Sequence, residues 1–442
     1  MVFRAQFITR STTHFVATNK MENTSADKIV TKGPVFYGWV IVAVIFLATT
    51  ASSVQLNPTI GVFIKPITEE FGWTRSQMAG AVTAGTILGG ILAIFMGRIV
   101  DRFGPRWVLF GAFLVMGSML LLMSRIEYLW HFYAITIVTR MTLQGVINLT
   151  CQTVVSKWFI NLRGRAIAIA NAGQRVGTGV IPYVTQIIIG TAGWRTAAWS
   201  IGLIAWGITL LPTALWLRRS PEDLGLLPDG QPQSNDKNIS GGPIILNQQR
   251  SYTLVEARKT RAFYLLGTAF TISSFIGTGV NFNLTPYLTD KGFAATDAVT
   301  ILMIWAASGI VGSLSAGLLA ERFRNQFLSI GFYIGVAIGI AILIIVNDMQ
   351  IGIIFAVIHG AFFGAALIMQ HIMLANYFGS ASIATIRGAL VPWQLLGNAL
   401  GPLAATLVFD TTGSYQAILF AYLILHAVIC AAILKATIPT RS

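Results

Sequence analysis

Two arginines stand inside long apolar stretches of this sequence. Arg140 lies in the middle of 131–155 and Arg175 in the middle of 164–190, and no Asp or Glu lies in the interior of any apolar stretch. A guanidinium keeps its proton, and leaving it unpaired at the centre of a bilayer costs roughly 3 kcal/mol or more. If these stretches cross a membrane, we expect both side chains to face a watery cavity and to bind an anionic substrate.

A structural role is the alternative for both arginines. Each guanidinium could be satisfied by backbone carbonyls or water at an interface between two halves of the protein, or by a lattice of Gln and Asn side chains. Gly173 and Gly177 form a GxxxG pattern that permits close helix packing, so this alternative carries more weight for Arg175 than for Arg140.

Other polar side chains inside the apolar stretches extend the candidate binding site. Gln144 and Asn148 follow Arg140 at steps of four residues, which places all three along one side of a helix. A second cluster surrounds Arg175 and consists of Asn171, Gln174 and Thr178. The remaining candidates are Gln55, Asn57, Asn281, Asn283, His359, Trp393, Gln394 and Asn398. Hydrogen bonding between helices for each Asn or Gln, and simple packing for Trp393, remain open as alternatives.

The composition favours a membrane protein. Of the 442 residues 55% are hydrophobic and only 10% are charged, which is too apolar for a soluble globule. A helix of about 20 apolar residues crosses the hydrocarbon of a bilayer. On this criterion the sequence predicts an all-α protein with twelve transmembrane helices, at 37–64, 76–98, 107–124, 131–155, 164–190, 195–217, 262–288, 297–320, 327–346, 350–374, 384–409 and 415–434.

The basic residues predict the orientation. Most of the 30 Lys and Arg residues fall in the two tails and in the loops after even-numbered helices, and short loops rich in these residues stay in the cytoplasm. We therefore expect a multi-pass protein of the plasma membrane, in the simplest case a bacterial inner membrane, with both termini cytoplasmic. This topology and anionic lipid explain the net charge of +14, so we expect no nucleic-acid partner.

The sequence repeats itself at one offset. The same shift superimposes Pro66 on Pro286, Gly72 on Gly292, Gly97 on Gly317, Gly177 on Gly397 and Gly193 on Gly413. Turn and breaker residues that recur in this way indicate two pseudo-symmetric bundles of six helices. The predicted division is a disordered cytoplasmic tail at 1–35, a bundle at 36–217, a cytoplasmic linker at 218–260, a second bundle at 261–434 and a tail at 435–442. Within the linker, 252–260 could form a short interfacial helix.

Motifs of enzymes are not found in the sequence. It contains no hydrolytic triad, metal cluster, phosphate-cradling glycine loop or redox motif, so we expect no catalysis, no cofactor and no metal. Cys151 and Cys430 have no pairing pattern and are expected to pack inside helices. The first 32 residues lack the apolar core of a secretory signal, and Met21 is as good a start as Met1.

One loop carries a resemblance to a known family. The segment GRIVDRFGPR at 97–106 fits the GxxxDRxGxR pattern of the major facilitator superfamily, and GLLAERFRN at 317–325 resembles a degenerate second copy. Within that superfamily the chain is similar to the monocarboxylate transporter and oxalate/formate antiporter groups, through YGW at 37–39 and KWFINLRGRAIAIANAG at 157–173. The resemblance implies the major facilitator fold and a transport function.

The loop motif predicts a conformational latch. Opposite charges at a helix end interact strongly with each other and with the helix dipole, and the resemblance implies that the latch steadies the outward-open state. The residues concerned are Gly97, Asp101, Arg102, Gly104, Arg106, Glu321 and Arg322. The alternative is a tight basic turn that serves topology alone.

These features together predict a secondary active transporter. It would move a small organic anion, a mono- or dicarboxylate, by alternating access, with Arg140 and Arg175 as the clamp. A broad-specificity exporter of amphipathic or drug-like compounds is the alternative, and a membrane sensor would need an additional signalling domain. We expect a monomer in the lipid bilayer.

The resemblance to these transporter groups does not tell which substrate is carried or which ion is coupled to its transport. Their Asp and Arg pair in helix eight has no counterpart in 298–320, and their cationic residues of helices eight and eleven and the Lys of helix one are also missing. Because no carboxylate is buried, proton coupling would depend on His359, His371 or the weak-acid substrate itself. A sodium site of the carboxylate type is disfavoured for the same reason.

Overall fold

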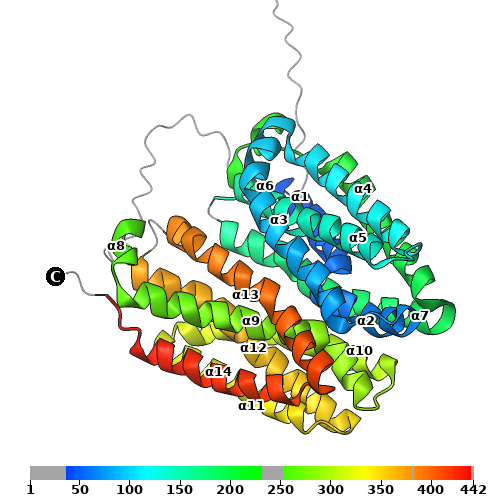
Figure 1. Ribbon diagram of the computed structural model, residues 1–442. Coiled ribbons are helices and arrows are strands. Elements are labelled where there is room, and N and C mark those ends of the chain that lie inside the picture. The colour runs from blue at the N-terminus through cyan, green and yellow to red at the C-terminus, as the bar shows by residue number, and fades with distance from the viewer. Residues whose placement is uncertain (1–35, 161, 231–251, 380–382, 440–442) are drawn as a thin grey trace, which may run out of the picture. The chain divides into compact units, whose positions relative to one another are not determined.

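A computed structural model describes residues 36–160, 162–230, 252–379 and 383–439, and all regular structure in these ranges is helical. The first half, coloured blue to green in Figure 1, contains α1 (Gly38–Ser52), η1 (Ser53–Gln55), α2 (Asn57–Phe71), α3 (Arg75–Phe103), α4 (Pro105–Met123), α5 (Leu129–Met141), η2 (Thr142–Ile147), α6 (Asn148–Trp158) and α7 (Arg163–Trp216). The second half contains α9 (Arg261–Asp290), α10 (Ala295–Ala320), α11 (Asn325–Ile344), α12 (Met349–Phe378), α13 (Ile383–Thr412) and α14 (Gln416–Lys435).

The connection between the halves contains short helices in its described parts. They are η3 (Pro221–Leu224), η4 (Pro228–Gly230) and α8 (Leu254–Arg258). The side chain of Thr253 caps α8, and Glu256 completes the capping box, so the short helix predicted at 252–260 is confirmed. The predicted tail at 1–35 and the linker residues 231–251 lie outside the described residues.

Nine helices in the described part of the chain are long and apolar enough to cross a membrane. One of them joins two predicted spans, because α7 runs through 164–190 and 195–217 and is broken only at Gly193, where φ is 81°. The predicted span 131–155 falls on α5, η2 and α6, and 384–409 falls within α13. All predicted spans therefore lie on helices, although the number twelve itself stays a prediction.

Several helices extend beyond the predicted limits. Helix α2 continues to Phe71, seven residues past the predicted limit at 64, and α3 to Phe103, five past 98. Apolar windows end where the first charged residues appear, whereas a helix continues until a residue such as Gly72, with φ of 67°, takes a left-handed conformation. The chain breaks just before Pro58, since Leu56 is extended between η1 and α2.

Helix pairing repeats between the two halves. In the first half α1 packs on α7, α3 on α5 and α4 on α7, and in the second half α9 packs on α13, α10 on α12 and α11 on α14. The offset glycines share their conformation: φ is 67° at Gly72 and 93° at Gly292, and 81° at Gly193 and 69° at Gly413. The internal repeat seen in the sequence is therefore a repeat of backbone geometry.

Small residues let the paired helices approach closely. A Cβ added to Gly173 or Gly177 would collide with the backbone and hydroxyl side chains of α1. Threonines of α1 use this closeness, because Thr49 Oγ1 donates to the carbonyl of Ala170 at 2.7 Å and Thr50 Oγ1 to that of Gly173 at 3.0 Å. The close packing expected from the GxxxG pattern is confirmed.

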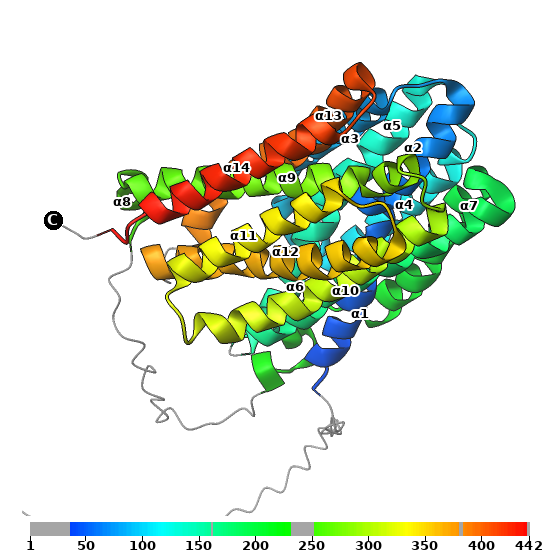
Figure 2. The same ribbon diagram turned by 90° about the horizontal axis from the view of Figure 1, so that it is seen from below.

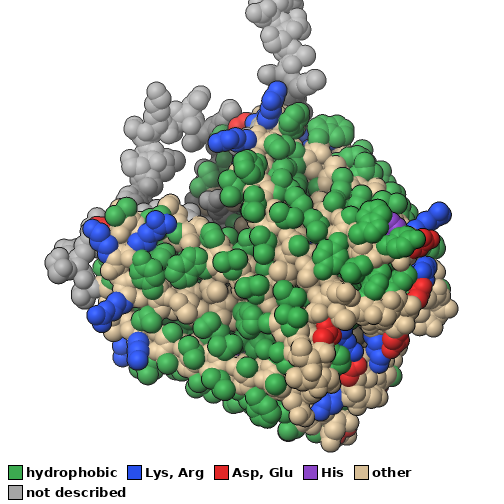
Figure 3. Space-filling view, in the orientation of Figure 1, with side chains coloured by type: hydrophobic (Ala, Val, Ile, Leu, Met, Phe, Trp, Pro, Cys, Tyr) green, Lys and Arg blue, Asp and Glu red, His purple; other side chains and the backbone are tan. Residues whose placement is uncertain are grey.

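The outer surface of the helices is suited to lipid. Large apolar side chains on spanning helices are widely exposed, among them Ile94 at 76%, Leu318 at 69% and Ile424 at 67%. Figure 3 shows apolar side chains across the visible face, with Lys and Arg gathered near its edges. An apolar belt with charged ends is typical of a protein embedded in a bilayer.

The helices run between two ends of the molecule, which Figure 2 shows from a second direction. The termini side is the end near Tyr37 and Lys435, where the Tyr37 hydroxyl donates to the carbonyl of Trp216 at 2.8 Å. The distal side is the opposite end, near Arg75 and Asp290. Contacts between the halves join α3 to α13, α2 to α9 and α7 to α10.

We predict that Gly364→Ala destabilises the second half. The new methyl group would collide with the backbone of Gly309, because α10 and α12 touch there without side chains between them. Overpacking of this kind typically costs about 1–3 kcal/mol, so the midpoint of thermal unfolding in detergent should fall by several degrees. Gly331→Ala is the matched control, since a Cβ at Gly331 meets nothing within 4 Å. An equal midpoint for both variants would contradict the prediction.

Candidate functional site

A cavity of about 380 Å³ lies between the two halves. The first half contributes Leu56, Asn57, Pro58, Thr86, Arg140, Gln144, Gln174, Arg175 and Thr178 to its wall. The second half contributes Ser273, Ser274, Gly277, Thr278, Asn281, Trp305, Phe363, Leu367, Gln370, His371, Gln394 and Asn398. Both arginines therefore face one cavity, and no Asp or Glu is among these wall residues.

Arg140 occupies the last turn of α5 and is only 3% exposed. Its Nη2 donates to Oδ1 of Asn57, which follows the break between η1 and α2, and its Nε has no partner among the described residues. Gly85 of α3 makes room for this side chain, because a Cβ there would lie 2.7 Å from the Cβ of Arg140. One side of the guanidinium is thus held by the protein, and the rest of its hydrogen-bonding capacity is not used.

Arg175 is half-buried on α7 and lies against the second half. A Cβ added to Gly309 of α10 would be 3.2 Å from Nη1 of Arg175, so the guanidinium lies close against that helix. Within the described part of the chain we find no hydrogen bond or ion pair for this guanidinium. Arg175 therefore lies at the boundary between the halves with its charge uncompensated.

The predicted span 131–155 contains a π-helical turn, η2, between Arg140 and Asn148. A π-turn bonds residue i to i+5, and such turns are frequent at functional sites. Gln144 follows Arg140 by four residues and lines the same cavity. Asn148 lies behind Gln144 and donates its Nδ2 to Gln144 Oε1 at 3.0 Å.

The structure brings more than half of the predicted binding residues together. Nine of them line the cavity: Arg140, Arg175, Gln144, Gln174, Thr178, Asn57, Asn281, Gln394 and Asn398. Asn148 supports the wall from behind. The other five predicted residues, Gln55, Asn171, Asn283, His359 and Trp393, are not among the wall residues.

Each of these five side chains has a different environment. Gln55 is 3% exposed in η1, and its Oε1 has no partner in the described structure. Asn171 is exposed on α7, one turn nearer the termini side than Arg175. Asn283 donates to the carbonyl of Gly279 at 2.9 Å and accepts from the Tyr415 hydroxyl at 3.0 Å. Trp393 packs on Phe263 and Tyr264.

His359 forms a second layer behind the cavity wall. It is 1% exposed, and its Nδ1 accepts a hydrogen bond from Nε1 of Trp305 at 2.7 Å. Its ring stacks on Phe363 with the planes 12° apart. Trp305 and Phe363 both line the cavity, so His359 orients wall residues and does not itself reach the interior.

Sequence reasoning missed most of the wall contributed by the second half. The missed polar and aromatic residues there are Ser273, Ser274, Thr278, Trp305, Phe363 and Gln370, and Thr86 was missed in the first half. A usable signal was present on α9, where Ser273, Gly277 and Asn281 recur every four residues and mark one small, polar face. Gln370 is anchored inside the second half, because its Nε2 donates to the Tyr333 hydroxyl at 3.1 Å.

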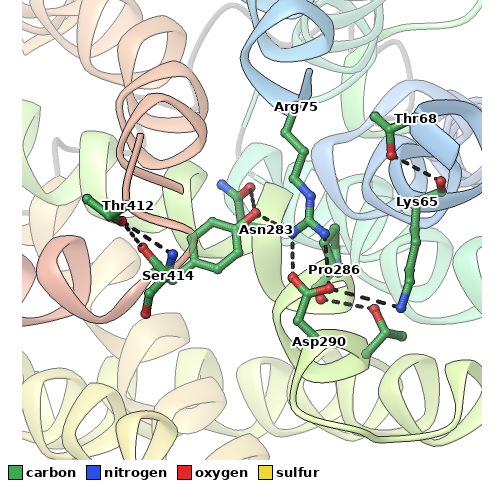
Figure 4. A network of polar contacts seen from close by, with 10 residues as sticks. Lys65, Thr68, Arg75, Asn283, Pro286, Asp290, Thr412 and Ser414 are labelled. Atoms are coloured by element: carbon green, nitrogen blue, oxygen red, sulfur yellow. Dashed lines mark hydrogen bonds and ion pairs between the residues drawn. The ribbon is translucent and has the colours of Figure 1, made fainter. Parts of the chain in front are cut away.

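Charged and polar contacts close the distal side between the halves, as Figure 4 shows. Arg75 at the start of α3 donates to both carboxylate oxygens of Asp290 at the end of α9, at 2.5 and 2.9 Å, and to the Tyr415 hydroxyl at 3.0 Å. Lys65 Nζ lies 4.0 Å from the same carboxylate. Next to them the amide of Ser76 donates to Asp410 at 2.8 Å.

The predicted latch lies at the other end of the same helices. Gly104 has φ of 79° between α3 and α4, which explains the need for glycine there. The Arg102 guanidinium lies 5.5 Å from the ring of Phe103, and that of Arg106 lies 5.0 Å from the ring of Trp107. Glu321 and Arg322 are exposed. Among the described side chains of these residues no ion pair joins the halves, the side chain of Asp101 lies outside them, and the latch stays a prediction.

The chain belongs to the Major Facilitator Superfamily. The profile of this superfamily matches residues 38–402, which is most of the chain. The fold agrees with it, since two repeated sets of spanning helices enclose a cavity between them. This is a family of multi-pass membrane transporters, which points to transport and not to catalysis. Among the described residues no group of three His, Cys, Asp or Glu side chains could hold a metal ion.

Several known proteins are similar to the chain. A glycerol-3-phosphate transporter of Bacillus subtilis (strain 168) is 25% identical over 299 residues, covering 63% of this chain and 65% of that protein. The chain thus spans just under two thirds of this relative's length. Monocarboxylate transporter 12 of Rattus norvegicus is 24% identical over 404 residues, covering 86% of this chain and 81% of that protein.

A solved structure shares the fold. It is a bacterial homolog of the human lysosomal transporter Spinster in an inward-facing, occupied conformation, with a TM-score of 0.65 and 16% identity. The match covers 91% of this chain and 95% of that one.

We predict a measurable coupling between Arg75 and Asp290. Removing one partner leaves the other without its charge-assisted hydrogen bonds, so Arg75→Gln and Asp290→Asn should not be additive in thermal stability. Hydrogen bonds to charged groups contribute about 1.5–3 kcal/mol, which sets the expected coupling free energy in a double-mutant cycle. The pair of Arg75→Gln with Glu127→Gln, an exposed residue outside this network, is the control. Additive effects for the first pair would show that the contact does not hold the halves together.

We also predict a purely structural defect for His359→Leu. The substitution leaves the buried Nε1 of Trp305 without an acceptor, which costs about 1–3 kcal/mol and should lower the midpoint of thermal unfolding. His359→Gln retains an acceptor oxygen and should recover part of this loss. A direct role in ligand binding would instead appear as a loss of affinity in both variants at unchanged stability.

Proposed function

We propose that this chain is a secondary active transporter that carries a small organic anion across a bacterial inner membrane by alternating access. The observation that supports it best is the cavity between the halves, which contains two guanidinium groups and no carboxylate among its described wall residues. Two uncompensated positive charges at this depth are costly, and a bound anion offsets that cost. We further propose that both termini lie in the cytoplasm, so that the closed distal side faces outward.

The two arginines supply different parts of the proposed clamp. Arg140 is fixed in direction by Asn57 and is almost fully buried, so it offers a preorganised donor. Arg175 lies free against Gly309, at the boundary where the halves move relative to each other. An anion bound by both arginines would contact the fixed guanidinium of Arg140 and the guanidinium of Arg175 at the moving boundary, which suits alternating access.

The names of the similar proteins support the class of substrate. Glycerol 3-phosphate and monocarboxylates are different compounds, yet both are small anions at neutral pH. A cavity of about 380 Å³ lies within the size range of small-molecule sites. Among its described wall residues only Trp305 and Phe363 are Trp, Tyr or Phe, which favours an organic anion over an amphipathic drug-like compound.

The charges of Arg140 and Arg175 also affect how transport of the anion is coupled to a second transport step. Closing both sides of an empty cavity would enclose two unpaired guanidinium groups, whereas closing them around an anion encloses a partly neutralised site. The loaded carrier should therefore reorient faster than the empty one, which favours anion exchange. The wall offers His371 as a titratable group, and co-transport of a proton with the acid would have to use it or the substrate itself.

The test is counterflow in proteoliposomes. We expect labelled anion, screened among lactate, pyruvate, succinate, oxalate and glycerol 3-phosphate, to accumulate only when unlabelled anion is present inside. Arg140→Gln and Arg175→Gln should each lower the apparent affinity about ten- to hundredfold, because charge-assisted hydrogen bonds to the substrate are lost.

Arg125→Gln is the control, since Arg125 is exposed and outside the cavity wall. It removes the same charge and should leave counterflow unchanged. Full anion flux in correctly folded Arg140→Gln and Arg175→Gln would overturn the proposed clamp. Transport of neutral amphipathic dyes in place of every anion would overturn the proposed substrate class.

A further inference from the structure

The two walls of the cavity differ in chemistry. Both arginines belong to the first half, on α5 and α7. The second half contributes no Lys, Arg, Asp or Glu to the wall but a set of neutral polar side chains, which we call the neutral wall: Ser273, Ser274, Thr278, Asn281, Gln370, Gln394 and Asn398. A substrate that only presented an acid group would leave this wall facing water.

Part of the neutral wall has unused hydrogen-bonding capacity. Oδ1 of Asn281 is buried and has no partner in the described structure. Ser274 and Asn398 line the cavity without a side-chain hydrogen bond to any described group. Gln370 and Gln394, by contrast, are joined to each other at 3.4 Å, and Gln370 also donates to Ser273 at 3.3 Å. A buried acceptor without a partner is unfavourable, so this oxygen of Asn281 is available to a donor from the substrate.

The volume of the cavity indicates how large the substrate is. Its 380 Å³ would hold roughly a dozen water molecules, each of which takes about 30 Å³ in the liquid. A three-carbon acid such as lactate has only half that number of non-hydrogen atoms and would leave much of the cavity to water. A substrate that touches both walls must carry polar groups along a chain beyond its acid group.

We propose that the substrate is a hydroxylated anion, such as a sugar acid or a polyol phosphate. Its acid group binds Arg140 and Arg175, and its hydroxyl groups donate to Asn281 and hydrogen-bond with the rest of the neutral wall. This inference rests on the proposed function, since it assumes that the passenger is an anion. It also gives the second half a role in transport, because a hydroxylated chain links the two halves and an apolar chain does not.

The experiment compares matched anions on the purified full-length protein in nanodiscs by titration calorimetry. Gluconate and hexanoate share six carbons and one carboxylate and differ in five hydroxyl groups. Glycerol 3-phosphate and propyl phosphate share three carbons and a phosphate and differ in two. Two neutral hydrogen bonds are worth about a factor of ten in affinity, so in at least one pair the hydroxylated member should bind about tenfold tighter or more.

A variant locates the effect on the neutral wall. Asn281→Ala should lower the affinity for the hydroxylated anion roughly three- to tenfold and leave the affinity for its apolar counterpart unchanged. Asn325→Ala is the matched control, because Asn325 also has a buried Oδ1 without a partner in the second half but is not a wall residue. It should change neither affinity.

The outcomes separate this inference from the proposed function. Equal or tighter binding of hexanoate and propyl phosphate would overturn the hydroxylated substrate and leave an anion transporter. The same holds if Asn281→Ala weakens both members of a pair equally. Absence of binding by all four anions would overturn the hydroxylated substrate and the anion function together. The pair that responds also tells whether the acid group is a carboxylate or a phosphate.

Discussion

The structure depends on the cost of keeping a guanidinium away from water. A lysine or a carboxylate can lose its charge when it is buried, but an arginine cannot, so the protein has to supply water or a partner at Arg140 and Arg175. The surrounding helices are shaped for this purpose. Gly85 makes room for one side chain and Gly309 for the other. The break before Asn57 brings an amide oxygen to Arg140.

Much of the fold could be predicted because the bilayer restricts what the chain can do. Long apolar segments must be helical in lipid, and the residues that interrupt them have conformations that few residues can adopt. Gly72, Gly193, Gly292 and Gly413 show this directly, since all four have positive φ and recur at the sequence offset. The predicted ends of α2 and α3 were wrong by several residues. Hydropathy indicates where the chain leaves the lipid, whereas the end of a helix depends on its cap.

The candidate site was harder to predict because the helix face, and not polarity, decides which residues line a cavity. Asn281 and Asn283 are both polar, yet two residues correspond to about 200° around a helix, and only Asn281 faces the cavity. Trp393 and Gln394 differ for the same reason by about 100°. The π-turn between Arg140 and Asn148 leaves no signal in the residue types. Ser and Thr of α9 are too common in membrane helices to stand out without that face.

The two ends of the molecule differ in their contacts, and the two copies of the repeat differ in their loops. On the distal side the halves are joined by Arg75 and Asp290, an ion pair whose side chains are 10% and 27% exposed. Such a pair can separate at moderate cost because both ends remain near water, unlike a pair in the apolar interior. On the termini side the two copies of the loop have diverged, since Gly104 has φ of 79° whereas Arg324, at the matching position, has φ of −63°. The first loop keeps the sharp glycine turn between two spanning helices, and the second replaces it with an extended residue. A latch that used both copies of the loop would therefore present Arg102 from the end of a helix and Arg322 from a turn.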